Sequence, residues 1–193
     1  MILGITGGTG CGKTTLLNVI RDQGGLVLDC DAIYHDLLKS DARLLHGIEA
    51  RFPGTVVNGV LDRKKLGNLV FSDEKALLDL NTITHDAVKR EVFRRLEESP
   101  PLAAIDAIAL FESGLAEFCD VSVAVLAPYD VRVQRLMKRD GISAEYAESR
   151  IKAQHSDGWF REKCDYALLN DATEEDFREI CLAFLTQLGI IKA

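Results

Sequence analysis

The chain has 193 residues, with 23 Lys and Arg against 30 Asp and Glu, so its formal net charge at pH 7 is −7. An acidic balance argues against broad binding of nucleic acid or of a membrane surface, and we expect neither as a partner. No apolar stretch approaches the length of a membrane span. The five cysteines are scattered without metal-binding spacing, which indicates reduced thiols in a cytoplasmic protein.

Short apolar runs alternate with segments of helical periodicity along the chain. Helices are expected after the first run and over 31–39, 63–71, 84–98, 131–139, 143–155 and 173–188, and another begins at Ser72. Strands are expected near 2–6, 26–29, 102–108, 121–126 and 166–169. This alternation predicts an α/β fold, a doubly wound parallel sheet of about five strands.

A long, mainly helical block separates the second and third expected strands. It covers about 40–98 and is the natural candidate for a helical substrate-binding insertion. The core would then consist of 1–39 and 100–193, and the whole chain, 1–193, would be one domain. Ligands should gather at the carboxyl ends of the strands.

A glycine-rich sequence follows the first expected strand directly. It reads Gly-Gly-Thr-Gly-Cys-Gly-Lys-Thr over 7–14, which is a complete P-loop, G-x4-G-K-[ST], between a strand and a helix. Its glycines allow backbone conformations in which N–H groups surround a phosphate. The pattern therefore predicts binding of a nucleoside triphosphate and Mg²⁺, a P-loop NTPase fold, and the nucleotide-binding residues Gly8, Thr9, Gly10, Cys11, Gly12, Lys13, Thr14 and Thr15.

Two residues of the loop have more specific expected roles. Lys13 should reach the β- and γ-phosphates, and the Thr14 hydroxyl should bind the metal ion. Cys11 is either an oxidation-sensitive thiol or a small residue that the loop tolerates. A guanine-reading N-K-x-D motif is missing, because Asn170-Asp171 is followed by Ala172, and this argues against a GTP-dependent switch.

Carboxylates occur near the ends of two expected strands. Asp31 follows the second strand, where it could accept a proton from an attacking hydroxyl, support Mg²⁺ through water, or only cap the next helix. Asp106 is the lone charge of the third strand. It either assists the metal or is a buried aspartate satisfied by backbone donors, and the apolar residues after it place it deep in the strand.

Three arginines, Arg132, Arg135 and Arg139, share one helix face. They are either part of a mobile lid that stabilises a phosphoryl group in transfer or a solvated basic face. His35 and His85 lie beside aspartates without metal-ligand spacing, so we expect them to contact substrate or cap helices.

Taken together, these motifs resemble dephospho-CoA kinase, the last enzyme of coenzyme A biosynthesis. The resemblance spans nearly the whole chain. It includes the loop at 4–15, Asp-Cys-Asp at 29–31, the segment 59–71, Ile-Thr-His at 83–85, Leu-Phe-Glu at 110–112, and positions 135, 139–140, 154, 165 and 170. A kinase for a nucleoside monophosphate or a sugar acid is the alternative within the same class.

The resemblance implies ATP-dependent phosphorylation of the ribose 3′-hydroxyl of dephospho-CoA. It makes Asp31 the catalytic base, with Lys13 and Thr14 on the triphosphate and metal. Arg139, in a lid of about 140–163, would stabilise the moving phosphoryl group. The helical block of about 40–98, with Arg63 and His85, would help to hold the CoA moiety, and His35 is a further substrate-binding candidate. Asn170 resembles a residue near the ATP adenine.

The chain also departs from the family pattern. Ile108 and Asp86 stand where the family has proline, and Asp171 stands where it often has glycine. Phe160 occupies a position at which relatives usually carry Lys or Arg, so Arg161 or Lys163 would have to supply the second cation of the lid.

Overall fold

The structure, a computed structural model, describes residues 1–97 and 101–191. The described chain forms two compact units. The core unit comprises residues 1–28 and those from 101 onward, and the insertion unit comprises residues 29–97. The insertion unit begins earlier than the expected boundary at residue 40, because helix α2 (Cys30–Ser40) packs on α5 (Glu74–Leu96) within it.

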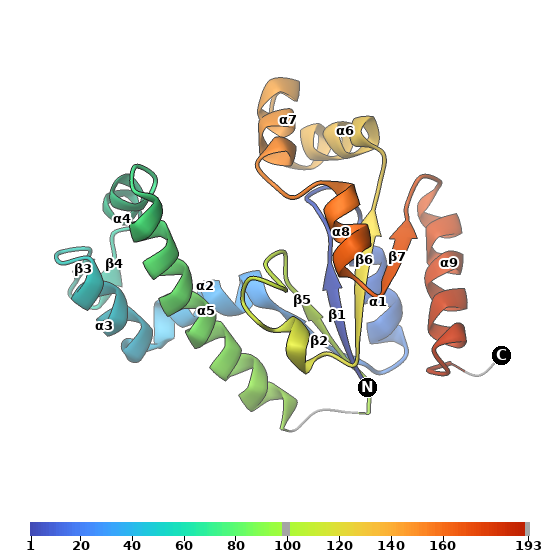
Figure 1. Cartoon of the computed structure of the whole chain (residues 1–193), viewed down its shortest axis with the longest axis horizontal. Coiled ribbons are helices and arrows are strands. Elements are labelled where there is room, and N and C mark those ends of the chain that lie inside the picture. Colours follow the sequence, from blue (N-terminus) through green and yellow to red (C-terminus); the bar gives the residue numbers. More distant parts are fainter. Residues whose placement is uncertain (98–100, 192–193) are drawn as a thin grey trace. The chain divides into compact units, whose positions relative to one another are not determined.

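A five-stranded sheet runs through the core unit, in the order β2-β5-β1-β6-β7 (Figure 1). Strand β1 pairs in parallel with β5 and β6, and β6 pairs in parallel with β7. The predicted parallel sheet is confirmed, and the carboxyl ends of these strands meet at one edge. The strands are β1 (Ile2–Thr6), β2 (Leu26–Asp29), β5 (Ala103–Asp106), β6 (Val121–Leu126) and β7 (Tyr166–Leu169).

Helices cover both faces of this sheet, as the doubly wound prediction requires. Alternate strand residues point to opposite faces, so Leu3 and Ile5 pack with the side chains of α1 and α9, whereas Ala124 and Leu126 pack with Phe160 of α8. The helices of this unit are α1 (Lys13–Asp22), α6 (Tyr129–Asp140), α7 (Ala144–Lys152), α8 (Asp157–Lys163) and α9 (Glu174–Gln187), and a 3₁₀ turn covers Ala116–Phe118.

The helix expected over 143–155 ends early. Helix α7 stops at Lys152, and a separate helix, α8, begins after Ser156, whose hydroxyl accepts a hydrogen bond from the Trp159 N–H at 3.2 Å. Ser156 is thus a second N-cap, which the prediction did not use. Thr173 is the N-cap of α9, because its hydroxyl accepts a hydrogen bond from the Asp176 N–H at 3.2 Å.

The insertion unit has its own small apolar core, formed mainly by Leu44, Ile48, Phe52, Leu66 and Val70. Its elements are α2, α3 (Ala42–Arg51), β3 (Val56–Val57), β4 (Val60–Leu61), α4 (Arg63–Val70) and α5. The predicted helical character is confirmed, although α5 is one helix where two were expected. Residue 98, the expected end of that segment, lies outside the described residues.

A two-stranded hairpin in this unit was not predicted. Strands β3 and β4 pair antiparallel across Asn58 and Gly59, which have positive φ values of 52° and 76°. An Asn-Gly pair with positive φ at both residues is typical of a tight hairpin turn, so this turn could have been predicted from the sequence.

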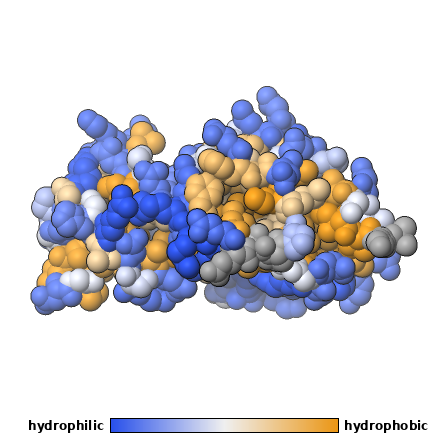
Figure 2. Space-filling model, turned by 90° about the horizontal axis from the view of Figure 1, so that it is seen from below, coloured by the Kyte–Doolittle hydropathy of each residue, from blue (hydrophilic) through white to orange (hydrophobic). Residues whose placement is uncertain are grey.

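Hydrophilic and hydrophobic residues are interspersed on the face drawn in Figure 2. Among the described helices, none combines the length and the apolar character needed to span a bilayer.

Candidate active site

The predicted phosphate loop connects the carboxyl end of β1 to the first turn of α1. Gly12 is the N-cap of α1 in the left-handed region, with φ of 87°, and no side chain caps the helix. Within the described chain, the N–H groups of Gly10, Gly12, Lys13 and Thr14 donate to no protein acceptor. Unpaired donors at a helix N-terminus form a binding site for an anion, so this geometry fits a phosphate group.

The carbonyl groups of the same loop are bonded to side chains from distant parts of the core unit. The Arg132 Nε donates to the Thr9 carbonyl at 3.0 Å, and the Asn170 Nδ2 donates to the Cys11 carbonyl at 2.9 Å. Arg135 donates to the Asn170 Oδ1 at 3.1 Å. Arg132 and Asn170 are each only 4% exposed. For Arg132 and Arg135, the solvated-face alternative is therefore wrong, because both hold the loop.

Two glycines of the loop are required by these close contacts. A Cβ atom on Gly8 would lie 2.2 Å from the Arg132 Nη2, and one on Gly12 would lie 2.2 Å from the Asn170 Nδ2. Real Cβ atoms do not come so close to other heavy atoms, so any larger residue would push these side chains out. Glycine at position 8 thus makes room for an arginine.

Lys13 and Thr14 lie at the start of α1, where the motif predicts them. The Lys13 Nζ donates to the Gly7 carbonyl at 3.0 Å. Thr14 is exposed, and its hydroxyl has no protein partner among the described residues. No cluster of three His, Cys, Asp or Glu side chains suited to a metal occurs in the described part of the chain. The exposed Thr14 hydroxyl is an oxygen donor of the kind that would fit Mg²⁺ together with substrate phosphates.

Cys11 is fully buried beneath the loop. Burial raises the pKa of its thiol, although the nearby charges of Arg132 and Lys13 oppose the change. A buried thiol with a raised pKa is a poor nucleophile, so Cys11 is a small packing residue rather than a reactive one.

Asp106 is the last residue of β5, in register with Ile5 of β1, and it is half-buried. The expectation that β5 continues to 108 is wrong, because the chain leaves the strand after Asp106. Asp106 therefore lies at the carboxyl edge of the sheet, beside the end of the strand that leads into the phosphate loop.

Asp29 and Asp31 have different roles at the start of α2. The Asp29 Oδ1 accepts a hydrogen bond from the Ala32 N–H at 2.9 Å, so Asp29 is the N-cap. The alternative that Asp31 only caps this helix is wrong. Asp31 lies in the first turn and is exposed, and its carboxylate bonds to no described residue of the insertion unit.

Two of the residues predicted to bind substrate meet in the insertion unit. His35 and Arg63 line a cavity of about 180 Å³, together with Lys39. The His35 Nδ1 lies 2.7 Å from the Asp31 carbonyl oxygen, which fixes the imidazole on α2. His85 lies in α5 and does not line this cavity.

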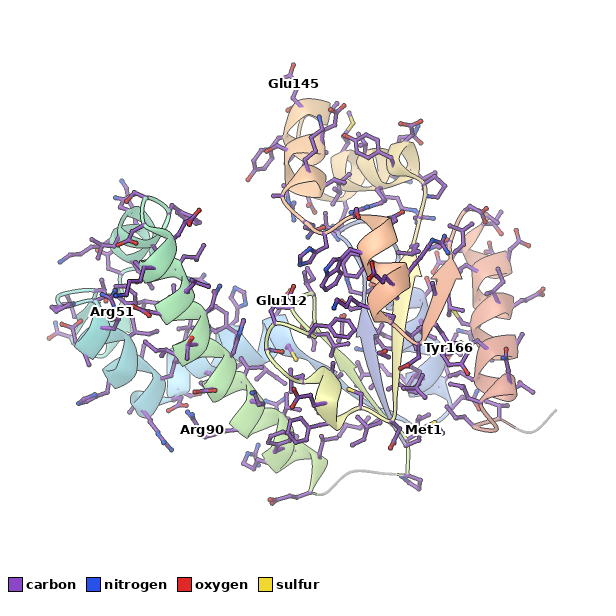
Figure 3. All side chains as sticks on the ribbon, viewed as in Figure 1. Met1, Arg51, Arg90, Glu112, Glu145 and Tyr166 are labelled. Carbon is purple, nitrogen blue, oxygen red and sulfur yellow. The ribbon has the colours of Figure 1, made fainter. Side chains whose placement is uncertain are left out.

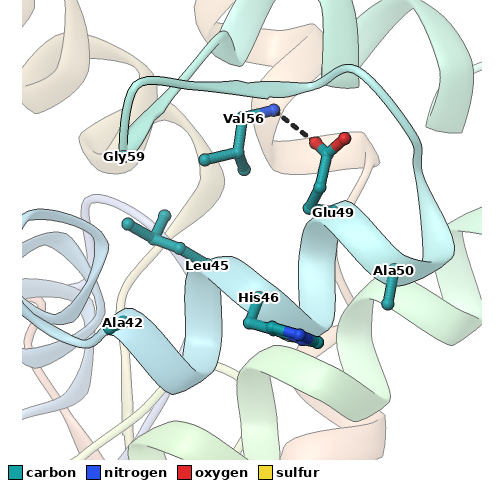
Figure 4. A pocket seen from close by; sticks show the side chains of 7 residues that line it. All are labelled: Ala42, Leu45, His46, Glu49, Ala50, Val56 and Gly59. Atoms are coloured by element: carbon teal, nitrogen blue, oxygen red, sulfur yellow. Dashed lines mark hydrogen bonds between the residues drawn. The ribbon is translucent and has the colours of Figure 1, made fainter.

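A larger cavity of about 430 Å³ opens between α3 and the hairpin (Figure 4). At its wall, the Glu49 carboxylate accepts a hydrogen bond from the Val56 N–H at 2.7 Å. Bonds from the backbone N–H groups of Gly54 and Val56 lower the pKa of Glu49. The cavity is otherwise lined mainly by small and apolar residues, and no sequence motif pointed to it.

The arginine predicted for the lid is exposed near the end of α6. Arg139 donates to the two oxygens of Asp140, at 2.7 and 2.9 Å, and Arg150 donates to the same carboxylate at 2.6 Å. The two guanidinium groups lower the pKa of Asp140 to about 2. Arg139 and Arg150 thus share one carboxylate; that Arg161 or Lys163 supplies the lid cation missing at position 160 stays a prediction.

The burial of Phe160 explains why this position departs from the family pattern. It is 1% exposed, packs on β6 and lies edge-on to Trp159, with ring centroids 5.2 Å apart. Nearby, the His155 Nε2 lies 2.7 Å from an oxygen of Glu112, which is labelled in Figure 3. In this chain, position 160 is a core position.

Asp165, another position of the family pattern, has a structural role. Its Oδ2 accepts hydrogen bonds from the Ser122 N–H at 2.8 Å and from the Ser122 hydroxyl at 2.7 Å, and these bonds lower its pKa. The contact joins the beginnings of β6 and β7 and so aligns the two strands.

Comparisons with known proteins agree with this geometry. The family model of CoaE, dephospho-CoA kinase, matches residues 1–176. A dephospho-CoA kinase of Corynebacterium diphtheriae is 34% identical over 97% of this chain and 98% of its own length. The crystal structure of TT1252 from Thermus thermophilus has a TM-score of 0.82 and 34% identity, covering 97% of both chains. Dephospho-CoA kinase from Campylobacter jejuni has a TM-score of 0.68 and 25% identity, covering 97% of this chain and 96% of its own.

The family model covers the phosphate loop, the insertion unit and the arginine-bearing helix in one continuous match. The same motifs had suggested the resemblance from sequence alone. The chain belongs to the dephospho-CoA kinase family.

Proposed function

We propose that this chain transfers the γ-phosphoryl group of ATP to the ribose 3′-hydroxyl of dephospho-CoA, giving coenzyme A and ADP. The observation that carries the proposal is the loop after β1, whose free N–H groups form an anion cradle in a chain that matches the dephospho-CoA kinase family over residues 1–176. The activity is the one that the family's name describes.

Asp31 acts as the general base in this proposal. As the 3′-oxygen attacks the γ-phosphorus, Asp31 takes the hydroxyl proton, and the bond to the ADP oxygen breaks. Its exposed carboxylate is available for this role because Asp29 caps the helix. A carboxylate already committed to capping would be a weaker acceptor.

Charge stabilisation comes from the core unit. The loop amides and Lys13 bind the β- and γ-phosphates, and Arg139 neutralises charge on the phosphoryl group in transfer. Mg²⁺, when bound to Thr14 and the phosphate oxygens, would supply further neutralisation there. Asn170 contributes to nucleotide binding through the loop that it supports, and it lies nearest the adenine in the family pattern.

The insertion unit would hold the CoA moiety. Arg63, Lys39 and His35 bring basic groups to one small cavity, which suits the pyrophosphate of dephospho-CoA. His85 is proposed as a further contact from α5. We assign the protein to the cytoplasm, because its cysteines are scattered along the sequence without metal-binding or paired spacing and its proposed substrate ATP is available there.

A panel of acceptors tests the proposed function. The protein is incubated with ATP and Mg²⁺ and with dephospho-CoA, a nucleoside monophosphate or a sugar acid, while ADP is measured. We expect ADP release above background only with dephospho-CoA. Faster release with either other acceptor would assign the chain to a different kinase reaction.

A further inference from the structure

Both backbone groups of Thr9, in the phosphate loop, are bonded to side chains, the N–H in the peptide unit shared with Gly8 and the carbonyl in the peptide unit shared with Gly10. The Thr9 N–H donates to the Gln154 Oε1 at 2.7 Å, and the Thr9 carbonyl accepts from the Arg132 Nε at 3.0 Å. The Thr9 N–H is therefore not among the loop donors that are free for an anion. Its two partners come from α6 and from the segment between α7 and α8.

Gln154 is itself fixed in place. The next residue, His155, bonds to Glu112 and stacks on Trp159 with ring centroids 3.8 Å apart and an interplanar angle of 7°. Arg132 is fixed by Asp157 at 3.3 Å and lies 3.5 Å from the Gln154 oxygen. The two peptide units on either side of the Thr9 Cα are thus each held by a side chain that is itself held by other groups.

Fixing two adjacent peptide planes in a glycine-rich loop restricts the backbone on either side of them. Gly8 and Gly10 flank Thr9, and glycines have many accessible backbone conformations, so the loop loses much entropy when it orders. Beyond the fixed planes, the N–H groups of Gly10, Gly12, Lys13 and Thr14 have no protein acceptor among the described residues. A preorganised site avoids part of the ordering cost when its ligand binds.

We infer that Gln154 is a positioning residue for nucleotide binding. It acts through the backbone of Thr9, whose N–H it holds while Arg132 holds the carbonyl, and it touches no reacting atom. The inference rests on the proposed function only in that the loop binds nucleotide, and it does not depend on which acceptor is phosphorylated. An acceptor oxygen at position 154 is the required chemical feature.

The test uses the full chain without any acceptor substrate. Gln154→Met removes the acceptor while keeping the length of the side chain, and Gln154→Glu keeps an acceptor oxygen. Gln134→Ala, an exposed glutamine of α6, is the matched control. Hydrogen exchange of the Thr9 amide is measured without nucleotide, and ADP binding is measured by calorimetry. Circular dichroism checks the fold of each variant.

We expect the Thr9 amide to exchange at least tenfold faster in Gln154→Met, and the Kd for ADP to rise about tenfold, as the loss of one buried hydrogen bond implies. Gln154→Glu keeps Thr9 protected, and Gln134→Ala changes neither quantity. Unchanged Thr9 exchange in Gln154→Met overturns the inference, and so does faster exchange with unchanged ADP affinity. If Gln154→Met fails to fold, an unprotected Thr9 in Gln154→Glu contradicts it equally.

The two proposals fail in different ways. A chain that binds ADP normally but phosphorylates no dephospho-CoA refutes the proposed function and leaves the role of Gln154 intact. A chain that makes coenzyme A while Gln154→Met binds ADP like the unmodified protein refutes only the role of Gln154.

Discussion

Asp29 and Asp31, which have one residue between them, are expected to have different roles. Asp31→Asn should lower kcat by about 10²- to 10⁴-fold with little change in the KM for ATP, because it removes only the proton acceptor. Asp29→Asn keeps an equally good N-cap and should retain activity and stability. Steady-state kinetics of the two variants check this. Equal losses in both would mean that Asp31 has no special role.

Adding one carbon atom at Gly8 tests how closely the Arg132 side chain packs against the phosphate loop. Gly8→Ala places a Cβ against the Arg132 guanidinium and should displace it, so the thermal midpoint and ADP affinity should both fall. Gly158→Ala is the matched control, since its added Cβ meets only the Ser156 hydroxyl at 3.7 Å. Calorimetry of both variants measures the difference. A Gly8→Ala protein as stable as the Gly158→Ala protein contradicts the close contact.

The Cys11 thiol should be unreactive while the protein is folded. Burial raises its pKa, so little thiolate forms at pH 8, and iodoacetamide should label Cys11 far more slowly than it does in urea. Peptide mapping by mass spectrometry gives the labelled fraction at this residue. Rapid labelling in the native state would show that the loop opens readily.

Local sequence signals predicted the loop residues well, but not the partners of the loop. Lys13 and Thr14 follow from a contiguous motif. The bonds from Arg132 and Asn170 join positions far apart in the chain, and no periodicity encodes such pairs. The sequence could not show that Asp29 is the N-cap of α2, because two aspartates close together at the start of a helix are equally good candidates.

Helix α9 depends on its first turn. Thr173 and Asp176 form a capping box, and Phe177 and Phe184 of this helix are buried in the core beside α1. Thr173→Ala should therefore destabilise the protein by about 0.5–2 kcal/mol, whereas Thr173→Ser should cost little. Urea unfolding gives the free energy of unfolding for each. Equal stability of the Ala and Ser variants would show that the cap contributes nothing.

Secondary structure was predictable where apolar runs were long and uninterrupted, as in β1 and β6. The hairpin at Asn58-Gly59 was missed, although its turn signal is strong, because its strands are only two residues each. The expected helix over 143–155 was too long because Ser156 starts a new helix. In both cases a turn or cap residue lay within a segment whose pattern looked continuously helical, and its signal was not used.

The stability of the whole molecule should fall in acid. The guanidinium groups of Arg94 and Arg95 lower the pKa of Glu91 to about 2, and Asp140 titrates at about 2 beside Arg139 and Arg150. A carboxylate whose pKa is lower in the folded than in the unfolded state stabilises the fold fully only at pH values above its unfolded-state pKa. For glutamate this pKa is about 4.5. That contribution is lost as the pH falls towards 2.

Glu91→Gln removes one of these groups and tests the sign. The variant should be less stable than the unmodified protein at pH 7, and the difference should shrink as the pH falls below about 4. Urea midpoints measured across this range check it. A difference that grows on acidification would contradict the assigned direction.

The division into two units could be predicted only in part from the sequence. The helical block was apparent from composition, but the insertion unit begins at Asp29 because α2 packs with α5 within that unit. Such a choice depends on which apolar face meets which, and short helices with similar patterns do not reveal it.

The identity of the phosphorylated product decides whether the proposed reaction is the right one. ATP, Mg²⁺ and dephospho-CoA are incubated with the purified chain, and the product is analysed by mass spectrometry and phosphorus NMR. We expect dephospho-CoA to gain one phosphoryl group, on its ribose 3′-oxygen, for each ATP consumed. Phosphate on another atom, or ADP and free phosphate without a phosphorylated acceptor, would contradict it.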